Sequence, residues 1–110
     1  MKIIVFTVAS TSGNSYKVTF KNCDQVITST CSCAAGEHGQ LCKHRFEILH
    51  GDISAISSGN ENEAAELLSW LHGTSIAEAL MQISEAEANY ENAKKKLSSA
   101  KKHLSRLLNG

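Results

Sequence analysis

The sequence predicts an α+β fold, and three observations lead to this prediction. Residues 16–21 alternate between apolar and polar side chains, which is typical of a strand with one buried face. Cysteine and histidine side chains gather between residues 31 and 44, and apolar residues recur every seven positions from residue 76 to residue 104. We therefore expect a small antiparallel β-meander with a short helix, followed by a helical hairpin or a long coiled-coil helix.

The N-terminal part is expected to contain three strands. Lys2–Val8 is rich in β-branched and other apolar residues, and a cluster of turn-forming residues follows it. Tyr16–Lys21 places Lys17 and Lys21 on the face opposite its apolar residues. Val26–Thr30 forms the third strand, which leads directly into the cysteine cluster. A three-stranded antiparallel meander is the simplest topology for these segments.

The cysteine and histidine cluster has the spacing C-x-C-x8-C-x-H. Its four members are Cys31, Cys33, Cys42 and His44. Three thiolates and one imidazole form a complete tetrahedral ligand set for zinc. The spacer between the two pairs contains Gly36 and Gly39, so the chain can turn back and bring the second pair to the first. We expect the meander and the short helix to surround one structural Zn²⁺ ion per chain, whose binding contributes to folding.

Other interpretations of these cysteines remain open. Four cysteines form two disulfides in some exported proteins, but residues 1–9 read better as a strand than as a signal peptide. The cysteines can also be unrelated buried thiols. Within the spacer, His38 is the main rival to His44 as the fourth ligand. Cys23 lies outside the pattern, and we expect it to be a packed free thiol or, less simply, an exchangeable fifth ligand.

The cluster resembles the SWIM zinc finger, whose signature is CxC…CxH. The step Cys42-Lys43-His44, followed by a helix, is also typical of that family. The resemblance is tight over residues 31–44, looser over the preceding strands and over the following helix to His50, and it does not extend further. It implies a β-hairpin that leads into a short helix, with zinc holding the two together. It also implies roles in DNA binding and protein–protein contacts, and no catalysis.

The sequence predicts two parts that a linker joins. They are a SWIM-like zinc-binding domain at residues 1–51, a linker at residues 52–60 and a helical region at residues 61–110. The short helix of the first part covers Lys43–His50. We expect Phe46 and Leu49 to face the sheet and Gly51 to end this helix.

Formal charge is zero overall, but it is unevenly distributed along the chain. Residues 1–46 carry a net charge of +3, residues 47–91 a net charge of −9 and residues 92–110 a net charge of +6. The acidic centre argues against a protein that wraps nucleic acid with its whole surface. Lysines on a sheet face are often only solvated, but here they also form a candidate phosphate-contacting group. Its members are Lys17, Lys21, Lys43 and Arg45.

A heptad seam is the second strong feature of the sequence. Ser75–Glu78 is a capping-box pattern, and no glycine or proline follows until Gly110, so one helix is expected over residues 76–108. The seam consists of Ile76, Ala79, Ile83, Ala86, Tyr90, Ala93, Leu97, Ala100, Leu104 and Leu107. The seam alternates between two heptad positions, of which one carries large apolar side chains and the other mostly alanine. The charge of the helix changes from acidic to basic along its length. These features favour an antiparallel homodimer. Alternatively, the helix folds back as a hairpin on a preceding helix, which we expect over residues 61–72, and both arrangements hold in a four-helix bundle.

The residue types present exclude several classes of function. A zinc ion with four protein ligands has no open position for water, and no glycine-rich phosphate motif is present, so we expect no enzymatic activity. No apolar stretch approaches the roughly 20 residues that a membrane-spanning helix needs. We expect a cytoplasmic binding or regulatory protein that contacts DNA or a nucleic-acid-processing protein complex. The alternative is a protein–protein adaptor or a small mobile-element-type inhibitor, in which zinc is purely structural and the helices bind the partner.

Overall fold

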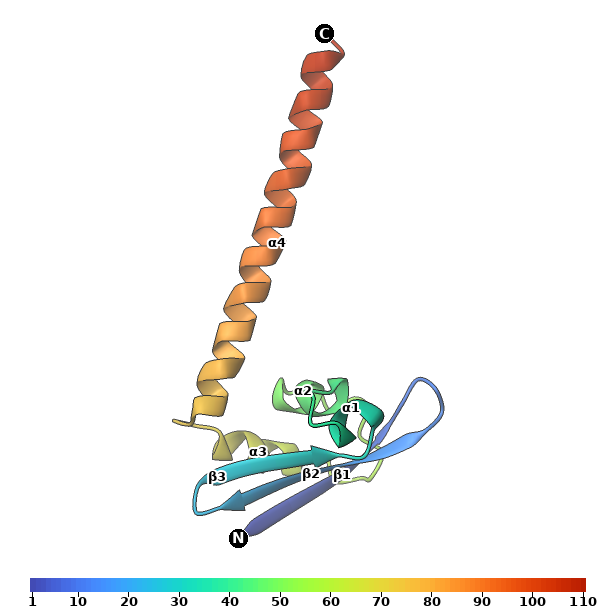
Figure 1. Cartoon of the computed structure of the whole chain (residues 1–110), viewed down its shortest axis with the longest axis vertical. Helices are drawn as coiled ribbons and strands as arrows, with labels where there is room; N and C mark the ends of the chain where they lie inside the picture. Colours follow the sequence, from blue (N-terminus) through green and yellow to red (C-terminus); the bar gives the residue numbers. More distant parts are fainter. The chain divides into compact units, whose positions relative to one another are not determined.

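The computed structural model describes all residues from 1 to 110 and confirms the predicted α+β class (Figure 1). The strands are β1 (Lys2–Ala9), β2 (Ser15–Cys23) and β3 (Val26–Cys31). The helices are α1 (Ala34–Glu37), α2 (Lys43–Leu49), α3 (Glu63–Trp70) and α4 (Ser75–Leu108). The chain divides into two compact units, Met1–His72 and Gly73–Gly110, which are described separately below.

The three strands form one antiparallel meander in the order β1-β2-β3, as predicted. Residues Asp24 and Gln25 connect β2 to β3, and their φ angles of 50° and 68° both lie in the left-handed region. Two such residues in succession match the twist of a tight hairpin. The Asn22 side chain supports this turn by accepting a hydrogen bond from the Gln25 N–H at 3.1 Å. The register that results places Cys31 opposite Val18, at the end of β3.

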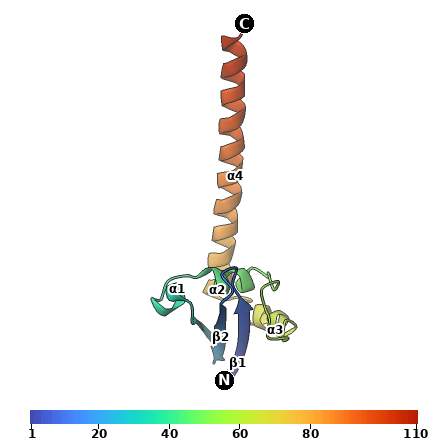
Figure 2. The ribbon, with the colours of Figure 1, turned by 90° about the vertical axis from the view of Figure 1, so that its right-hand side faces the viewer.

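The core of the first unit lies against one face of the sheet. Alternate residues of β1 and β2 are buried, including Phe6, Val18 and Phe20, whereas Lys17 and Lys21 on the other face are exposed. This confirms the predicted alternation of β2. The rings of Phe6 and Phe20 pack edge to face with their centroids 6.2 Å apart. Figure 2 shows α1, α2 and α3 grouped around β1 and β2.

Helix α2 faces the core through Ile48, which is 2% exposed. The sequence predicted Phe46 and Leu49 in this role, and the prediction was wrong for Phe46. That residue is half-buried, with its ring 4.5 Å from the ring of His50, whereas Leu49 packs at the edge of the core. Because residues four apart lie on the same helix face, a helix that turns His44 toward the ligand cluster also turns Ile48 toward the sheet.

The segment between α2 and α3, which the sequence predicted to be a linker, follows the outer edge of β1. The Ala9 N–H donates to the Ala55 carbonyl and the Ser57 N–H donates to the Thr7 carbonyl, both at 2.8 Å. Ile56, between these two contacts, is buried. The segment therefore satisfies backbone groups that an edge strand would otherwise leave unpaired.

Helix α4 is one uninterrupted helix, as predicted, and none of its residues is buried. It begins one residue earlier than the predicted capping box implies, because Thr74 and not Ser75 is the N-cap. The Thr74 hydroxyl accepts a hydrogen bond from the Ala77 N–H at 3.3 Å, which satisfies one of the free donors of the first turn. No helix of the structure combines the length and the apolar character needed to cross a membrane.

Candidate metal centre

The fold brings together the four residues that the spacing predicted as ligands. Cys31 ends β3, Cys33 is the N-cap of α1, Cys42 is the N-cap of α2, and His44 lies in the first turn of α2. Their ligand atoms all lie within 4.8 Å of one another, and the three cysteines are buried. Four donors from three successive elements thus converge on one point.

The dimensions of this cluster fit a single metal ion. A tetrahedral zinc site with Zn–S bonds of about 2.3 Å places its sulfur atoms about 3.8 Å apart. The Cys31 Sγ and the His44 Nδ1 are 3.9 Å apart, and no pair of ligand atoms in the cluster exceeds 4.8 Å. All the cysteines of the chain are free thiols. The Cys3His cluster is therefore placed to hold one metal ion.

Two residues that the sequence left as further candidates lie outside this cluster. His38 is the C-cap of α1 and is not among the clustered ligands. Cys23 ends β2 beside the hairpin turn and is exposed, so the prediction of a packed thiol was wrong. Its cross-strand partner, Val26, is exposed as well, so this end of the hairpin lies outside the core.

Backbone N–H groups support two of the sulfur atoms. The Gly36 N–H donates to the Cys33 Sγ and the Arg45 N–H donates to the Cys42 Sγ, each at 3.4 Å. Both bonds arise because each cysteine caps the helix that follows it, with its sulfur in the position of a capping oxygen. Hydrogen bonds of this kind stabilise thiolate charge and orient metal ligands.

The pKa values of two of the clustered thiols depart from the ordinary value in opposite directions. Burial raises the pKa of the Cys31 thiol to about 12. Burial also opposes ionisation of Cys42, but hydrogen bonds from Arg45, Cys31 and Cys33 outweigh it and lower the Cys42 pKa. Burial thus opposes a thiolate at Cys31, whereas the hydrogen bonds to Cys42 favour one there. A divalent cation removes this obstacle, because its own charge deprotonates coordinating thiols.

Arg45 clamps the elements that carry the ligands. Its guanidinium donates from Nη1 to the Ser29 carbonyl of β3 at 3.3 Å and from Nη2 to the Gln40 carbonyl of the spacer. The fork geometry of an arginine suits two acceptors at once. Arg45 therefore ties β3 and the spacer to α2, and its guanidinium is already engaged within the chain.

Two further residues shape the site, and the sequence did not identify either as part of it. The Tyr16 ring lies against the imidazole of His44, with ring centroids 5.0 Å apart. Gly36 allows a close approach, since a Cβ at this position would lie 2.4 Å from the Cys31 carbonyl oxygen. The alternation of β2 indicated the buried face for Tyr16, but nothing in the spacing indicated its contact with His44.

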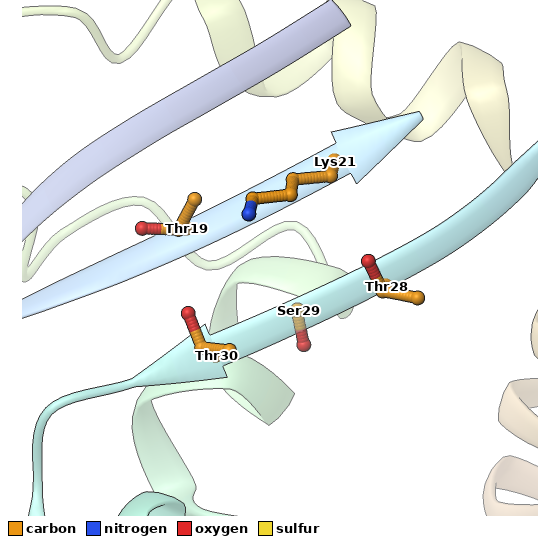
Figure 3. Close-up of a pocket in the computed structure, with 5 residues that line it drawn as sticks. All are labelled: Thr19, Lys21, Thr28, Ser29 and Thr30. Atoms are coloured by element: carbon orange, nitrogen blue, oxygen red, sulfur yellow. The ribbon is translucent and has the colours of Figure 1, made fainter. Parts of the chain in front are cut away.

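The remaining candidate residues occupy the surface. Lys17, Lys21 and Lys43 are exposed. Lys21 lies beside Thr19, Thr28 and Thr30 on the open face of the sheet, around a surface depression of about 60 Å³ (Figure 3). Of the predicted seam residues, Ile76 and Ile83 are half-buried and the others are exposed.

A comparison with protein-family models gives no match, and neither do comparisons with curated proteins and with solved structures.

The close approach at Gly36 gives the first prediction. Gly36→Ala forces the added Cβ against the Cys31 backbone, so we expect a loss of about 1–3 kcal/mol of stability and a metal affinity at least about tenfold lower. Competition with a chromophoric chelator and denaturant unfolding measure the two effects.

The matched control for this substitution is Gly39→Asn in the same spacer. Gly39 has a φ of 72°, and a Cβ at this position would have no atom within 4 Å. Asparagine tolerates this backbone region better than most other residues. Equal effects of the two substitutions would show that the spacer's turn, and not the contact with Cys31, matters.

Proposed function

We propose that this chain is a non-enzymatic, SWIM-type zinc-binding module that acts as a cytoplasmic, nucleic-acid-associated binding protein. The observation that carries the proposal is the cluster of Cys31, Cys33, Cys42 and His44, whose ligand atoms lie within 4.8 Å of one another. Three thiolates and one imidazole form a ligand set that binds zinc in preference to harder cations, which favour oxygen ligands. Four protein ligands complete a tetrahedral shell, so the ion holds the fold together and leaves no position for a reacting water.

The elements around the cluster support the SWIM-type assignment. The hairpin of β2 and β3 leads into the first two cysteines, and α2 supplies the histidine, which is the arrangement that the resemblance implies. In this proposal the ion joins β3 to α2, and Arg45 reinforces the same junction through Ser29 and Gln40.

The open face of the sheet is the proposed nucleic-acid contact. None of the three strands contains Asp or Glu, and the exposed face of β2 carries Lys17 and Lys21. Thr19 lies opposite Thr30 and Lys21 lies opposite Thr28, so hydroxyl and ammonium donors alternate across two strands (Figure 3). Such donors are the groups that contact phosphate oxygens. Lys43 adds a further exposed charge on α2, whereas the guanidinium of Arg45 is engaged by backbone carbonyls.

A second candidate function is that of a protein–protein adaptor, in which zinc is purely structural. The observation that favours it is the exposure of large apolar residues on α4, including Leu97, Leu104 and Leu107. Salt distinguishes the two functions, because binding to phosphates weakens steeply with added salt, whereas an apolar interface does not.

Native mass spectrometry tests the zinc proposal. We expect one Zn²⁺ per chain, lost on treatment with a strong chelator, with a red shift in the fluorescence of Trp70, the sole tryptophan, which packs against the core. Cys42→Ser should abolish stoichiometric zinc binding. Cys23→Ser, which also removes one thiol but outside the cluster, should retain it. A zinc-free mass, lowered by disulfide formation, would refute the proposal.

Fluorescence anisotropy with labelled DNA tests the nucleic-acid proposal. We expect Lys17→Ala combined with Lys21→Ala to weaken binding about tenfold at low salt and to reduce the slope of log affinity against log salt by about 2. The control is Lys95→Ala combined with Lys102→Ala on the outer face of α4, which removes the same charge. If both pairs weaken binding equally, or if the wild-type chain binds no DNA at low salt, the sheet face is not the contact.

A further inference from the structure

Helix α4 carries an apolar seam that no other part of its own unit, Gly73–Gly110, covers. The helix runs for 34 residues, and none of them is buried. Tyr90, Leu97, Leu104 and Leu107 are each more than half exposed. A stripe of large apolar side chains at heptad spacing is stable in water mainly when a second helix covers it. The occupant of the seam can be inferred from its size pattern, its charges and the length of the helix.

We propose that α4 pairs with α4 of a second copy of this chain as an antiparallel coiled coil, with the two-fold axis between Glu91 and Asn92. This interface does not depend on the metal centre. It assigns to the second unit a function of its own, which is to join two copies of the first unit.

The length of α4 and its side-chain sizes select the same register. When two antiparallel copies overlap completely, Ser75 of one is level with Leu108 of the other. The residues that face each other across the seam are then Ile76 and Leu107, Ala79 and Leu104, Ile83 and Ala100, Ala86 and Leu97, and Tyr90 and Ala93. Except at the ends, every large residue meets an alanine, which allows close approach without gaps. A shift by one residue removes both the full overlap and the matching of sizes.

Charge complementarity supports the antiparallel direction. From Ser75 to Glu91 the helix has four acidic and no basic residues, and from 92 to 108 it has six basic and no acidic residues. Complete antiparallel overlap therefore places the acidic half of each helix against the basic half of the other. At the centre, Glu87 flanks Lys94 of the second copy, twice by symmetry. Lys94 already lies along the seam, with its Nζ 5.8 Å from the centre of the Tyr90 ring.

A parallel pair satisfies neither condition. In an unstaggered parallel coiled coil each seam residue meets itself, so Tyr90 opposes Tyr90 and Ala93 opposes Ala93. The layers of paired large residues hold the two helices apart, so the layers of paired alanines between them leave unfilled space. The flanking positions then bring Lys96 of one copy beside Lys101 of the other, which is repulsive. Both the packing and the charges thus favour the antiparallel pair.

The test uses charge reversal on the zinc-loaded full chain, followed by sedimentation velocity. We expect the wild-type chain to be a dimer at tens of micromolar. Glu87→Lys and Lys94→Glu should each weaken the dimer about tenfold, because each creates two like-charged pairs. An equimolar mixture should recover the dimer as a heterodimer, which native mass spectrometry identifies by mass when one of the two variants is labelled with nitrogen-15. The chain that carries both reversals restores both pairs and should dimerise like the wild type.

Two control variants carry the same charge changes at positions away from the seam. Glu85 and Lys95 both lie on the outer face of the helix. We therefore expect Glu85→Lys and Lys95→Glu to remain dimeric. Circular dichroism verifies that all variants retain their helix. A wild-type chain that remains monomeric would overturn the proposal and leave the seam to a different protein. A dimer whose two single variants do not recover on mixing would overturn the antiparallel register.

Discussion

The convergence of three buried thiols and one imidazole is the constraint on which the N-terminal unit depends. Burial raises the pKa of the Cys31 thiol and so resists negative charge there, yet β3, the spacer and α2 all end or begin at the cluster. The unit is small, and its largest fully buried side chains are few, with Phe6 and Phe20 at the centre. A sheet with so small a core gains much of its stability from a metal ion. In our account zinc compensates the buried charge and closes the fold in one step.

Local patterns in the sequence predicted the strands, the long helix and the clustering of three cysteines and one histidine, because each pattern has a direct physical cause. The alternation of β2 follows from one buried face, and the C-x-C and C-x-H spacings follow from two ligand pairs that must reach one ion. The uninterrupted α4 follows from a long run without glycine or proline. The left-handed pair Asp24–Gln25 lies between the second and third predicted strands, where the chain has to reverse direction.

What the sequence did not predict depends on contacts that form only when the chain folds around the ligand cluster. The phase of α2 is set by the ligand cluster, so Ile48 and not Phe46 meets the core. Arg45 reads as a surface cation until the carbonyls of Ser29 and Gln40 are placed beside it. Gly36 reads as a turn residue, although its main role is to approach the Cys31 backbone closely. Each of these roles depends on how the chain folds around the cluster, which the pattern of residue types does not show.

The central claim is that one zinc ion is held by three sulfurs and one nitrogen, all from this chain. X-ray absorption spectroscopy at the zinc edge of the purified protein measures this coordination directly. The account predicts three sulfur neighbours at about 2.3 Å and one imidazole nitrogen at about 2.0–2.1 Å, with no water in the shell. Two or fewer sulfurs, or an additional oxygen ligand, would contradict a closed structural site.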